Sequence, residues 1–328
     1  MAFLSILMIM FFHFCGPHIE YYSSSVDGSF ILTLERRFNT YIGSIGVEIF
    51  VFLSGMGLYY SFSKNDDMRQ FFKKRFKRIL IPYLYVGTIF WVLKDAVYLS
   101  AGLNRVFQDL SFYTFFTEGV KTIWFILFLI IAYTFFPLIY KAIYYGDNQR
   151  HLVGLLLVLA TIALPIILRE VSKPLYSNTQ IALTRIPLFI VGVYAGKMIK
   201  DNKKIPHPLV ICGIAIAFVL QYYSKKVELI SYKDRYVAAY FGIALIMLLI
   251  YILQMVGRFE FLMRVFRFFG KYSLELYLLH ITMRNYMTTI GLPCYKTRFY
   301  AVMILIATLL SVILKEISSQ TERLLFRE

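Results

Sequence analysis

The sequence is poor in cysteine and in acidic residues. Its three cysteines, Cys15, Cys212 and Cys294, are far apart and form no CxxC pair, so we expect neither a disulfide framework nor a metal site. Asp and Glu number 19 against 35 Lys and Arg, a formal net charge of +16. The chain also has no Gly/Ser-rich linker and no repeat of the solenoid kind. These absences favour one domain over residues 1–328.

The composition that remains is that of a membrane protein. Hydrophobic residues make up 59% of the chain, charged residues 16%, and the mean hydropathy is +0.64. A soluble domain could not bury so much apolar surface, and the long uncharged runs exclude disorder. The first apolar run lacks a small-residue cleavage site, so we expect a span there and no cleaved signal peptide. The positive charge suits an anionic membrane surface. Nucleic acid is not an expected partner, because no soluble basic domain could carry it.

Hydropathy predicts an all-α integral membrane protein with about ten transmembrane helices in a single bundle. The strongest orienting signal lies between Lys64 and Arg78, where seven Lys and Arg residues stand against two Asp. Because cytoplasmic loops are enriched in Lys and Arg, we expect this stretch and both termini to be cytoplasmic. The predicted spans are 2–17, 42–62, 79–99, 121–144, 152–168, 181–199, 208–223, 236–256, 273–291 and 298–315.

Two residues inside these spans could carry proton chemistry. His13 lies about eleven residues into the first span, roughly 16 Å along a helix, and a histidine among apolar side chains could act as a general base or be a satisfied polar residue. Glu48 lies near the outer end of the second span. A carboxylate at membrane depth is costly unless it is paired or faces a wet cavity, so it marks a functional position.

Other polar residues are weaker candidates for a substrate site or for a structural role. Arg75 and Arg78 are three residues apart, a spacing that places two guanidinium groups side by side for phosphate, although a charge run here could serve topology alone. Arg185, at the outer start of the sixth span, could reach the interface or pair with Glu48. Trp124 suits an interface anchor better than a ligand contact. The remaining candidates are Ser54, Glu275 and His280.

Five segments, in this order, are similar to the membrane acyltransferase-3 family. They are GVEIFVFLSG (Gly46–Gly55), RFKRILIPY (Arg75–Tyr83), IWFILFLIIAY (Ile123–Tyr133), RIPLFIVGVYAG (Arg185–Gly196) and GKYSLELYLLH (Gly270–His280). The resemblance covers most of the chain. It implies about ten membrane helices and an O-acyltransferase that moves an acyl group, usually acetyl, from cytoplasmic acetyl-CoA or another acyl-CoA to a sugar hydroxyl outside.

The resemblance also implies roles for individual residues. The first-span histidine of the family matches His13, its intramembrane acidic residue matches Glu48, and its cytoplasmic arginine pair matches Arg75 and Arg78. His13 would be the base, Glu48 would orient it, and the arginines would hold the CoA phosphates. One position departs from the family: a basic residue is expected eleven positions before the histidine, and Ala2 stands there. That basic residue either lies upstream of Met1 or has been lost.

Three functions are compatible with the sequence. The first is a multi-pass O-acetyltransferase of the plasma or inner membrane, with acyl-CoA and a glycan acceptor (a polysaccharide or a lipid-linked glycan) as its partners. The second is a transporter or flippase of a sugar or acyl species, in which a proton or substrate relay is formed by His13, Glu48, His280 and Arg185. The third is a catalytically inactive assembly subunit. The sequence does not specify the oligomeric state, the acyl group or the acceptor sugar.

Overall fold

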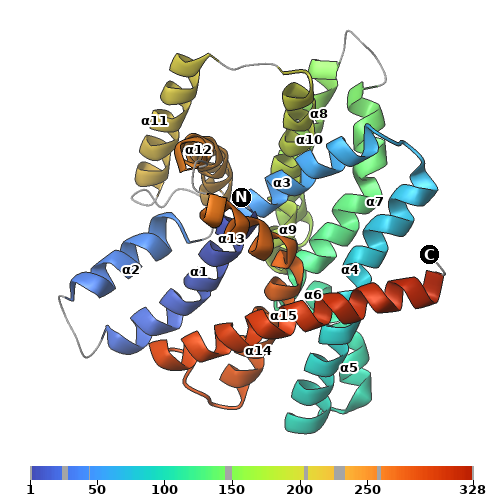
Figure 1. The fold of residues 1–328 in the computed structure, drawn as a ribbon, viewed down its shortest axis with the longest axis vertical. Coiled ribbons are helices and arrows are strands. Elements are labelled where there is room, and N and C mark those ends of the chain that lie inside the picture. Colours follow the sequence, from blue (N-terminus) through green and yellow to red (C-terminus); the bar gives the residue numbers. More distant parts are fainter. Residues whose placement is uncertain are drawn as a thin grey trace. The chain divides into compact units, whose positions relative to one another are not determined.

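The computed structural model describes residues 2–23, 29–43, 45–144, 150–202, 206–224, 233–256 and 260–326. Within these ranges every regular element is a helix (Figure 1). This confirms the all-α fold, as expected where each backbone N–H and C=O must be satisfied inside its own segment. The helices are α1 (Ala2–Tyr22), α2 (Phe30–Tyr41), α3 (Ile45–Phe62), α4 (Met68–Trp91), the π-helix η1 (Val92–Tyr98), α5 (Gly102–Leu110), α6 (Tyr113–Thr117), α7 (Trp124–Tyr144), α8 (Arg150–Val171), α9 (Lys173–Leu183), α10 (Ile186–Lys200), α11 (His207–Ser224), α12 (Lys233–Val256), α13 (Glu260–Lys271), α14 (Ser273–Thr289) and α15 (Thr297–Phe326).

Eight stretches of the described chain are long and apolar enough to cross a bilayer, so the protein is an integral, multi-pass membrane protein. Two predicted spans, 236–256 and 273–291, are not among these stretches: in α12 the apolar stretch found among the described residues is Arg235–Leu249, and α14 has 17 residues. Ten spans and cytoplasmic termini therefore stay predictions. The eight stretches are Ala2–Tyr22, Phe30–Phe62, Met68–Tyr98, Trp124–Tyr144, His151–Val171, Lys173–Lys200, His207–Ser224 and Thr297–Leu325.

The basic stretch before the third predicted span is mostly helix, where the sequence indicated a loop. Asp67 caps α4, since its carboxylate accepts hydrogen bonds from the backbone N–H groups of Arg69 (2.9 Å) and Gln70 (3.2 Å). Neither glycine nor proline interrupts the chain from there to Pro82, so the helix continues directly into apolar sequence. The basic side chains are thus held on a helix. Lys and Arg in the other segments predicted to be cytoplasmic also support that orientation, and some of these residues lie outside the described ranges, namely Lys203, Lys204, Arg258 and Arg327.

Two compact units make up the chain. The first comprises Met1–Asn65, Leu138–Ala163 and Thr184–Lys271, and the second comprises Asp66–Pro137, Leu164–Leu183 and Tyr272–Glu328. The expectation of a single domain over 1–328 stays a prediction.

In the first unit α3 packs against α10 through glycines. A Cβ added at Gly55 would overlap the backbone carbonyl of Phe189, and one at Gly192 would overlap the carbonyl of Phe52. Small residues let membrane helices approach this closely, and the gain is van der Waals contact along both backbones. Residue numbers rise together along the contact, from Glu48 beside Arg185 to Ser63 beside Lys200, so α3 and α10 run parallel, as the order of predicted spans requires.

The helices α1 and α3 of the same unit run antiparallel. A Cβ at Gly46 would lie 2.8 Å from the carbonyl oxygen of Ser5 and 2.8 Å from the Ile9 side chain, whereas Gly43 faces the ring of Phe12. The α1 residue number rises as the other falls, which fixes opposite directions. Consecutive spans are expected to alternate in this way.

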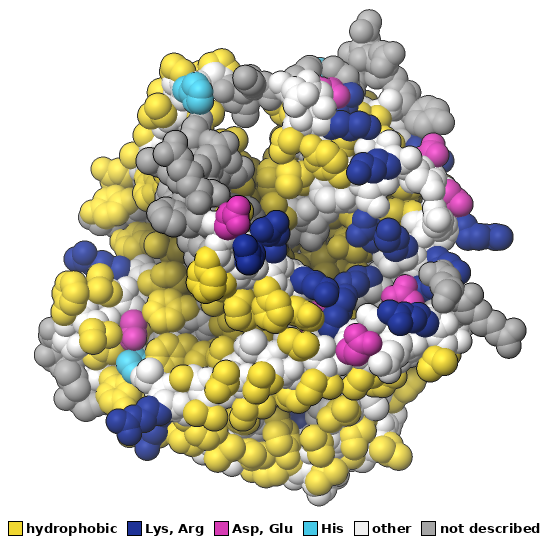
Figure 2. Space-filling view, viewed as in Figure 1, with side chains coloured by type: hydrophobic (Ala, Val, Ile, Leu, Met, Phe, Trp, Pro, Cys, Tyr) yellow, Lys and Arg dark blue, Asp and Glu magenta, His cyan; other side chains and the backbone are white. Residues whose placement is uncertain are grey.

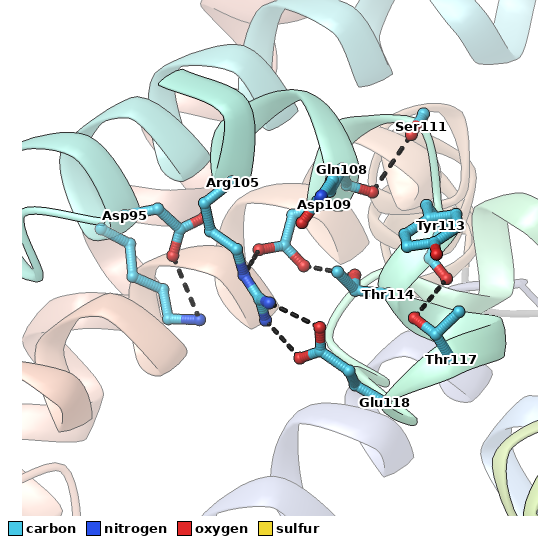
Figure 3. Close-up of polar contacts among 10 residues, drawn as sticks. Asp95, Arg105, Gln108, Asp109, Ser111, Tyr113, Thr114, Thr117 and Glu118 are labelled. Carbon is cyan, nitrogen blue, oxygen red and sulfur yellow. Dashed lines mark hydrogen bonds and ion pairs between the residues drawn. The ribbon is translucent and has the colours of Figure 1, made fainter. Parts of the chain in front are cut away.

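The second unit contains a polar cluster in the segment that follows α4, on α5 and around α6 (Figure 3). The guanidinium of Arg105 lies between two carboxylates: its Nε donates to Asp109 (2.9 Å), and its two terminal nitrogens donate to Glu118 (2.7 Å each). Asp109 also accepts a hydrogen bond from the Thr114 hydroxyl. Hydrogen bonds to Arg105 lower the pKa of Glu118, and the same bonds raise the pKa of Arg105. The cluster ties α5 to the segment that follows α6.

Much of the surface is apolar, as expected of helices in contact with lipid. Figure 2 shows hydrophobic side chains in quantity on the face drawn, with Lys and Arg gathered in patches. Helix α15 alone exposes Val302, Leu305, Leu309 and Ile313. A water-soluble protein would not expose so many large apolar side chains on one helix.

The Arg105–Glu118 pair generates a prediction about pH. The folded-state pKa of Glu118 lies below its unfolded value, so its contribution to stability is present above the unfolded pKa of about 4.3 and is lost as pH falls through the folded pKa. Because Glu118 is exposed, screening keeps the effect small. Glu118→Gln should lower the melting temperature in detergent by a few degrees at pH 7, and the difference should shrink below pH 4. A difference of the same size at pH 3 would contradict the assignment.

Candidate functional site

The buried ion pair between Glu48 and Arg185 is the clearest polar feature of the first unit. Arg185 Nε donates to Glu48 Oε2 at 3.0 Å, and the two side chains are only 5% and 2% exposed. Glu48 lies in the first turn of α3, where the helix dipole favours a negative charge. The sequence suggested this pairing, and the structure shows it. Each charge offsets part of the cost of burying the other.

Arg185 lies deeper along its helical stretch than the sequence indicated. We expected it at the outer start of the sixth span, but helix begins twelve residues earlier, at Lys173, and the candidate span is Lys173–Lys200. The helix is interrupted by a turn at Thr184 and Arg185, between α9 and α10. Such a break at membrane depth is tolerated where the backbone is buried in protein, and both residues are buried.

His13 lies in α1 and is half-buried, with its ring centroid 5.7 Å from that of Phe12. Pro17 follows four residues later inside the same helix. Because proline has no N–H, it cannot donate the helical hydrogen bond that the His13 carbonyl would otherwise accept. The helix therefore changes its backbone pairing one turn beyond the predicted base.

The register of α1 on α3 separates His13 from Glu48. Ile9 faces Gly46, His13 lies four residues beyond Ile9, and Glu48 lies two residues beyond Gly46 in the opposite direction. Six residues at 1.5 Å each place the two levels about 9 Å apart along the helix axes. The partner that the structure gives Glu48 is Arg185, and a direct role for Glu48 at His13 stays a prediction.

Arg75 lies in α4 and is half-buried. Its guanidinium lies 6.0 Å from the ring centroid of Phe71, at the outer limit of a cation–π contact. Its Nε is buried, and among the described residues it has no hydrogen-bond partner. A buried N–H without an acceptor is costly, and a ligand oxygen is one group that could satisfy it.

Arg78, one turn further along α4, is held by Glu275 of α14. The two terminal nitrogens of Arg78 donate to the two oxygens of Glu275, Nη2 to Oε2 at 3.0 Å and Nη1 to Oε1. Lys315 of α15 adds a second cation 3.5 Å from Oε1. Glu275 is fully buried, whereas Arg78 and Lys315 are 34% and 22% exposed. These three charges sum to +1, and the two cationic side chains are partly open to solvent or ligand.

The other sequence candidates occupy structural positions. His280 is fully buried in α14, and its Nδ1 donates to the Leu276 carbonyl at 3.1 Å. Trp124, expected as an interface anchor, is buried at the start of α7 beside Phe125 and Phe128. Ser54 is half-buried in α3. His13, Glu48, Ser54 and Arg185 thus belong to the first unit, and Arg75, Arg78, Trp124, Glu275 and His280 to the second.

Sequence reasoning missed two polar features. Asp95 lies inside the predicted span 79–99 and is 1% exposed, and its Oδ2 has no hydrogen-bond partner within the described ranges. An acidic residue in an apolar run was the available signal. The second feature is a pair of His18 in α1 and Glu35 in α2, 2.8 Å apart. We expected both in a loop, and a separation of 17 residues gave no indication of contact.

Two cavities lie away from these residues. A groove of about 380 Å³ in the second unit is lined by apolar side chains of α4, α14 and α15, such as Ile89, Leu279 and Ile313. A pocket of about 320 Å³ in the first unit lies between α8 and α10, where the Tyr194 hydroxyl contacts His151 Nδ1. Neither lining, in the described part of the chain, includes a residue that the sequence singled out for chemistry.

Comparison with known proteins gives one match. Residues 3–316 match the profile of a family described as an acyltransferase domain, that is, nearly the whole chain. No curated protein and no solved structure matches.

The Glu48–Arg185 pair predicts a specific pattern of stability. Arg185→Met alone leaves a buried carboxylate without its cation and should cost about 3–5 kcal/mol of unfolding free energy. Adding Glu48→Leu should restore most of that loss, because two apolar residues then replace the pair. Unfolding of the single and double variants in detergent measures the coupling between the two sites. Additive losses would show that the two side chains do not depend on each other.

Proposed function

We propose that this chain, which belongs to the membrane acyltransferase-3 family, transfers an acetyl group from cytoplasmic acetyl-CoA to a sugar hydroxyl outside the cell membrane. The acceptor is an extracytoplasmic polysaccharide or a lipid-linked glycan. The observation that carries the proposal is the match of residues 3–316 to the acyltransferase domain. The placement of the candidate residues on membrane helices supports it, since the reaction needs a base and a grip for the donor phosphates.

The donor site of the proposal is at the start of α4. Arg75 offers a buried Nε that has no acceptor in the described residues, and Arg78 has five N–H donors, of which two are used by Glu275. Glu275 thereby fixes the plane of the Arg78 guanidinium and leaves its other donors for phosphate oxygens. With both termini in the cytoplasm, as the Lys and Arg distribution favours, these groups would meet CoA there.

The chemical step of the proposal uses His13. The sugar hydroxyl gives up its proton as its oxygen attacks the thioester carbonyl, the new C–O bond forms and the C–S bond breaks. His13 receives the hydroxyl proton, directly or through a relay, and the proton ends on the thiolate of CoA. Glu48 carries a buried negative charge whose level lies about 9 Å from that of His13 along the helix axes, and in this proposal it favours the imidazolium while Arg185 fixes its carboxylate.

Replacing His13 tests this proposal. Glutamine donates and accepts hydrogen bonds at similar size but has no basic nitrogen, so His13→Gln should keep the fold while removing the base. We expect acetyl transfer to fall by about 100-fold or more, with acetyl-CoA affinity near the wild-type value. The measurement is base-labile label transferred from isotope-labelled acetyl-CoA to membranes of the producing cells. Full transfer by the glutamine variant would overturn the assignment of His13, and a wild-type protein without transfer would overturn the proposed function.

A further inference from the structure

A histidine–carboxylate pair that no sequence motif indicated joins α1 to α2. His18 Nδ1 lies 2.8 Å from Glu35 Oε2, and the two side chains are 12% and 9% exposed. An ionised carboxylate can only accept, so Nδ1 carries the proton and donates it to Glu35. The other ring nitrogen of a neutral His18, Nε2, then bears a lone pair that can accept a proton. This is the arrangement by which a carboxylate orients a general base.

The surroundings hold the pair in place. The ring of His18 lies against the rings of Phe14 and Tyr22, with centroids 4.7 and 4.8 Å apart. On α2 the buried residues are Leu32 and Glu35, so the carboxylate lies on the face of this helix that packs inward. For an ion pair that only joins two helices, lysine or arginine would suffice, because both stay positively charged. Histidine differs from both because it can accept and release a proton near neutral pH.

We propose that His18 and Glu35 form a catalytic dyad for the acyl transfer, in which His18 is a catalytic residue and Glu35 a positioning residue. The proposal rests on the proposed function and identifies the relay that it leaves open. His18 lies five residues beyond His13 on α1, a rise of about 7.5 Å. Five residues also turn the helix by about 140°, so the two side chains are too far apart for a direct hydrogen bond, and the proposal requires water molecules to bridge them.

The relay balances with no further reactant. The acceptor hydroxyl gives its proton to Nε2 of His18 while its oxygen forms the bond to the acyl carbon. The C–S bond breaks, and the electron pair leaves on the sulfur of CoA. The proton passes from His18 through water to His13 and from His13 to the thiolate. The products are the ester and CoA thiol, and both histidines return to their starting state.

Glutamine substitutions separate a dyad from a contact that only joins two helices. His18→Gln keeps a hydrogen-bond donor toward Glu35, and Glu35→Gln keeps an acceptor for Nδ1 but removes the negative charge that stabilises an imidazolium. If the contact only holds the two helices together, it should therefore survive both substitutions. For the dyad we expect His18→Gln to lower transfer of labelled acetyl by about 100-fold and Glu35→Gln to lower it by about tenfold or more. Melting temperature and acetyl-CoA affinity should stay near wild type in both variants. The matched control is Glu20→Gln, an exposed carboxylate two residues from His18 on the same helix.

Two further measurements close the test. Imidazole added to a His18→Ala variant should restore part of the lost transfer, which a structural role would not allow. The double variant of His13→Gln with His18→Gln should be no slower than the slower single variant, because residues of one relay fail together. Wild-type rates in both His18→Gln and Glu35→Gln, or losses that multiply in the double variant, would overturn the dyad and leave the proposed function standing. Absence of transfer by the wild type would instead overturn the proposed function itself.

Discussion

A carboxylate buried in a membrane protein must have its charge compensated, and this constraint organises both units of the structure. In the first unit Glu48 holds Arg185 at 3.0 Å. In the second, Glu275 holds Arg78 through both oxygens and has Lys315 at 3.5 Å. Each carboxylate is almost fully buried. Loss of its cation would therefore leave an uncompensated buried charge, which costs several kcal/mol of unfolding free energy. The helices that carry the partners cannot shift independently without that cost.

The two pairs differ in what they leave accessible. Glu48 and Arg185 are both enclosed, so they form a fixed dipole inside the packed interface of α3 and α10. Glu275 is enclosed, but its two cations remain about a quarter to a third exposed. The first pair therefore sets a fixed field around α1 and α3, whereas the second presents positive charge to an anion. A base in the first unit and a phosphate grip in the second match this difference.

Much of the fold could be predicted from the sequence, because apolar run length and the positions of Lys and Arg depend on local chain properties. The all-helical membrane fold and the Glu48–Arg185 pair are of this kind, since few cations lie at membrane depth to meet Glu48. The helical start of α4 was missed because a dense basic run favours a loop by charge alone, whereas the cap at Asp67 makes it helical.

The polar contacts that shape the candidate site were largely beyond the sequence. Arg78 and Glu275 are 197 residues apart, and His18 and Glu35 are 17 apart on different helices. Pairs of this kind depend on which helix faces pack together, and that is decided by many small apolar contacts. The spacing of Arg78 indicates only Arg75, its neighbour on the same helix, and gives no sign of a contact with Glu275. The structure places the third partner, Lys315, on α15.

The central claim is that the arginines of α4 hold the phosphates of an acyl-CoA, and titration of acetyl-CoA into the detergent-purified protein tests it most directly. The wild type should bind, and Arg75→Ala and Arg78→Ala should each weaken binding by about 1.5–3 kcal/mol, the scale of a lost charged hydrogen bond. Lys74→Ala, which removes one exposed charge from the same helix, should change the affinity little. Equal affinity in the wild type and both arginine variants, or no binding by the wild type, would contradict the account.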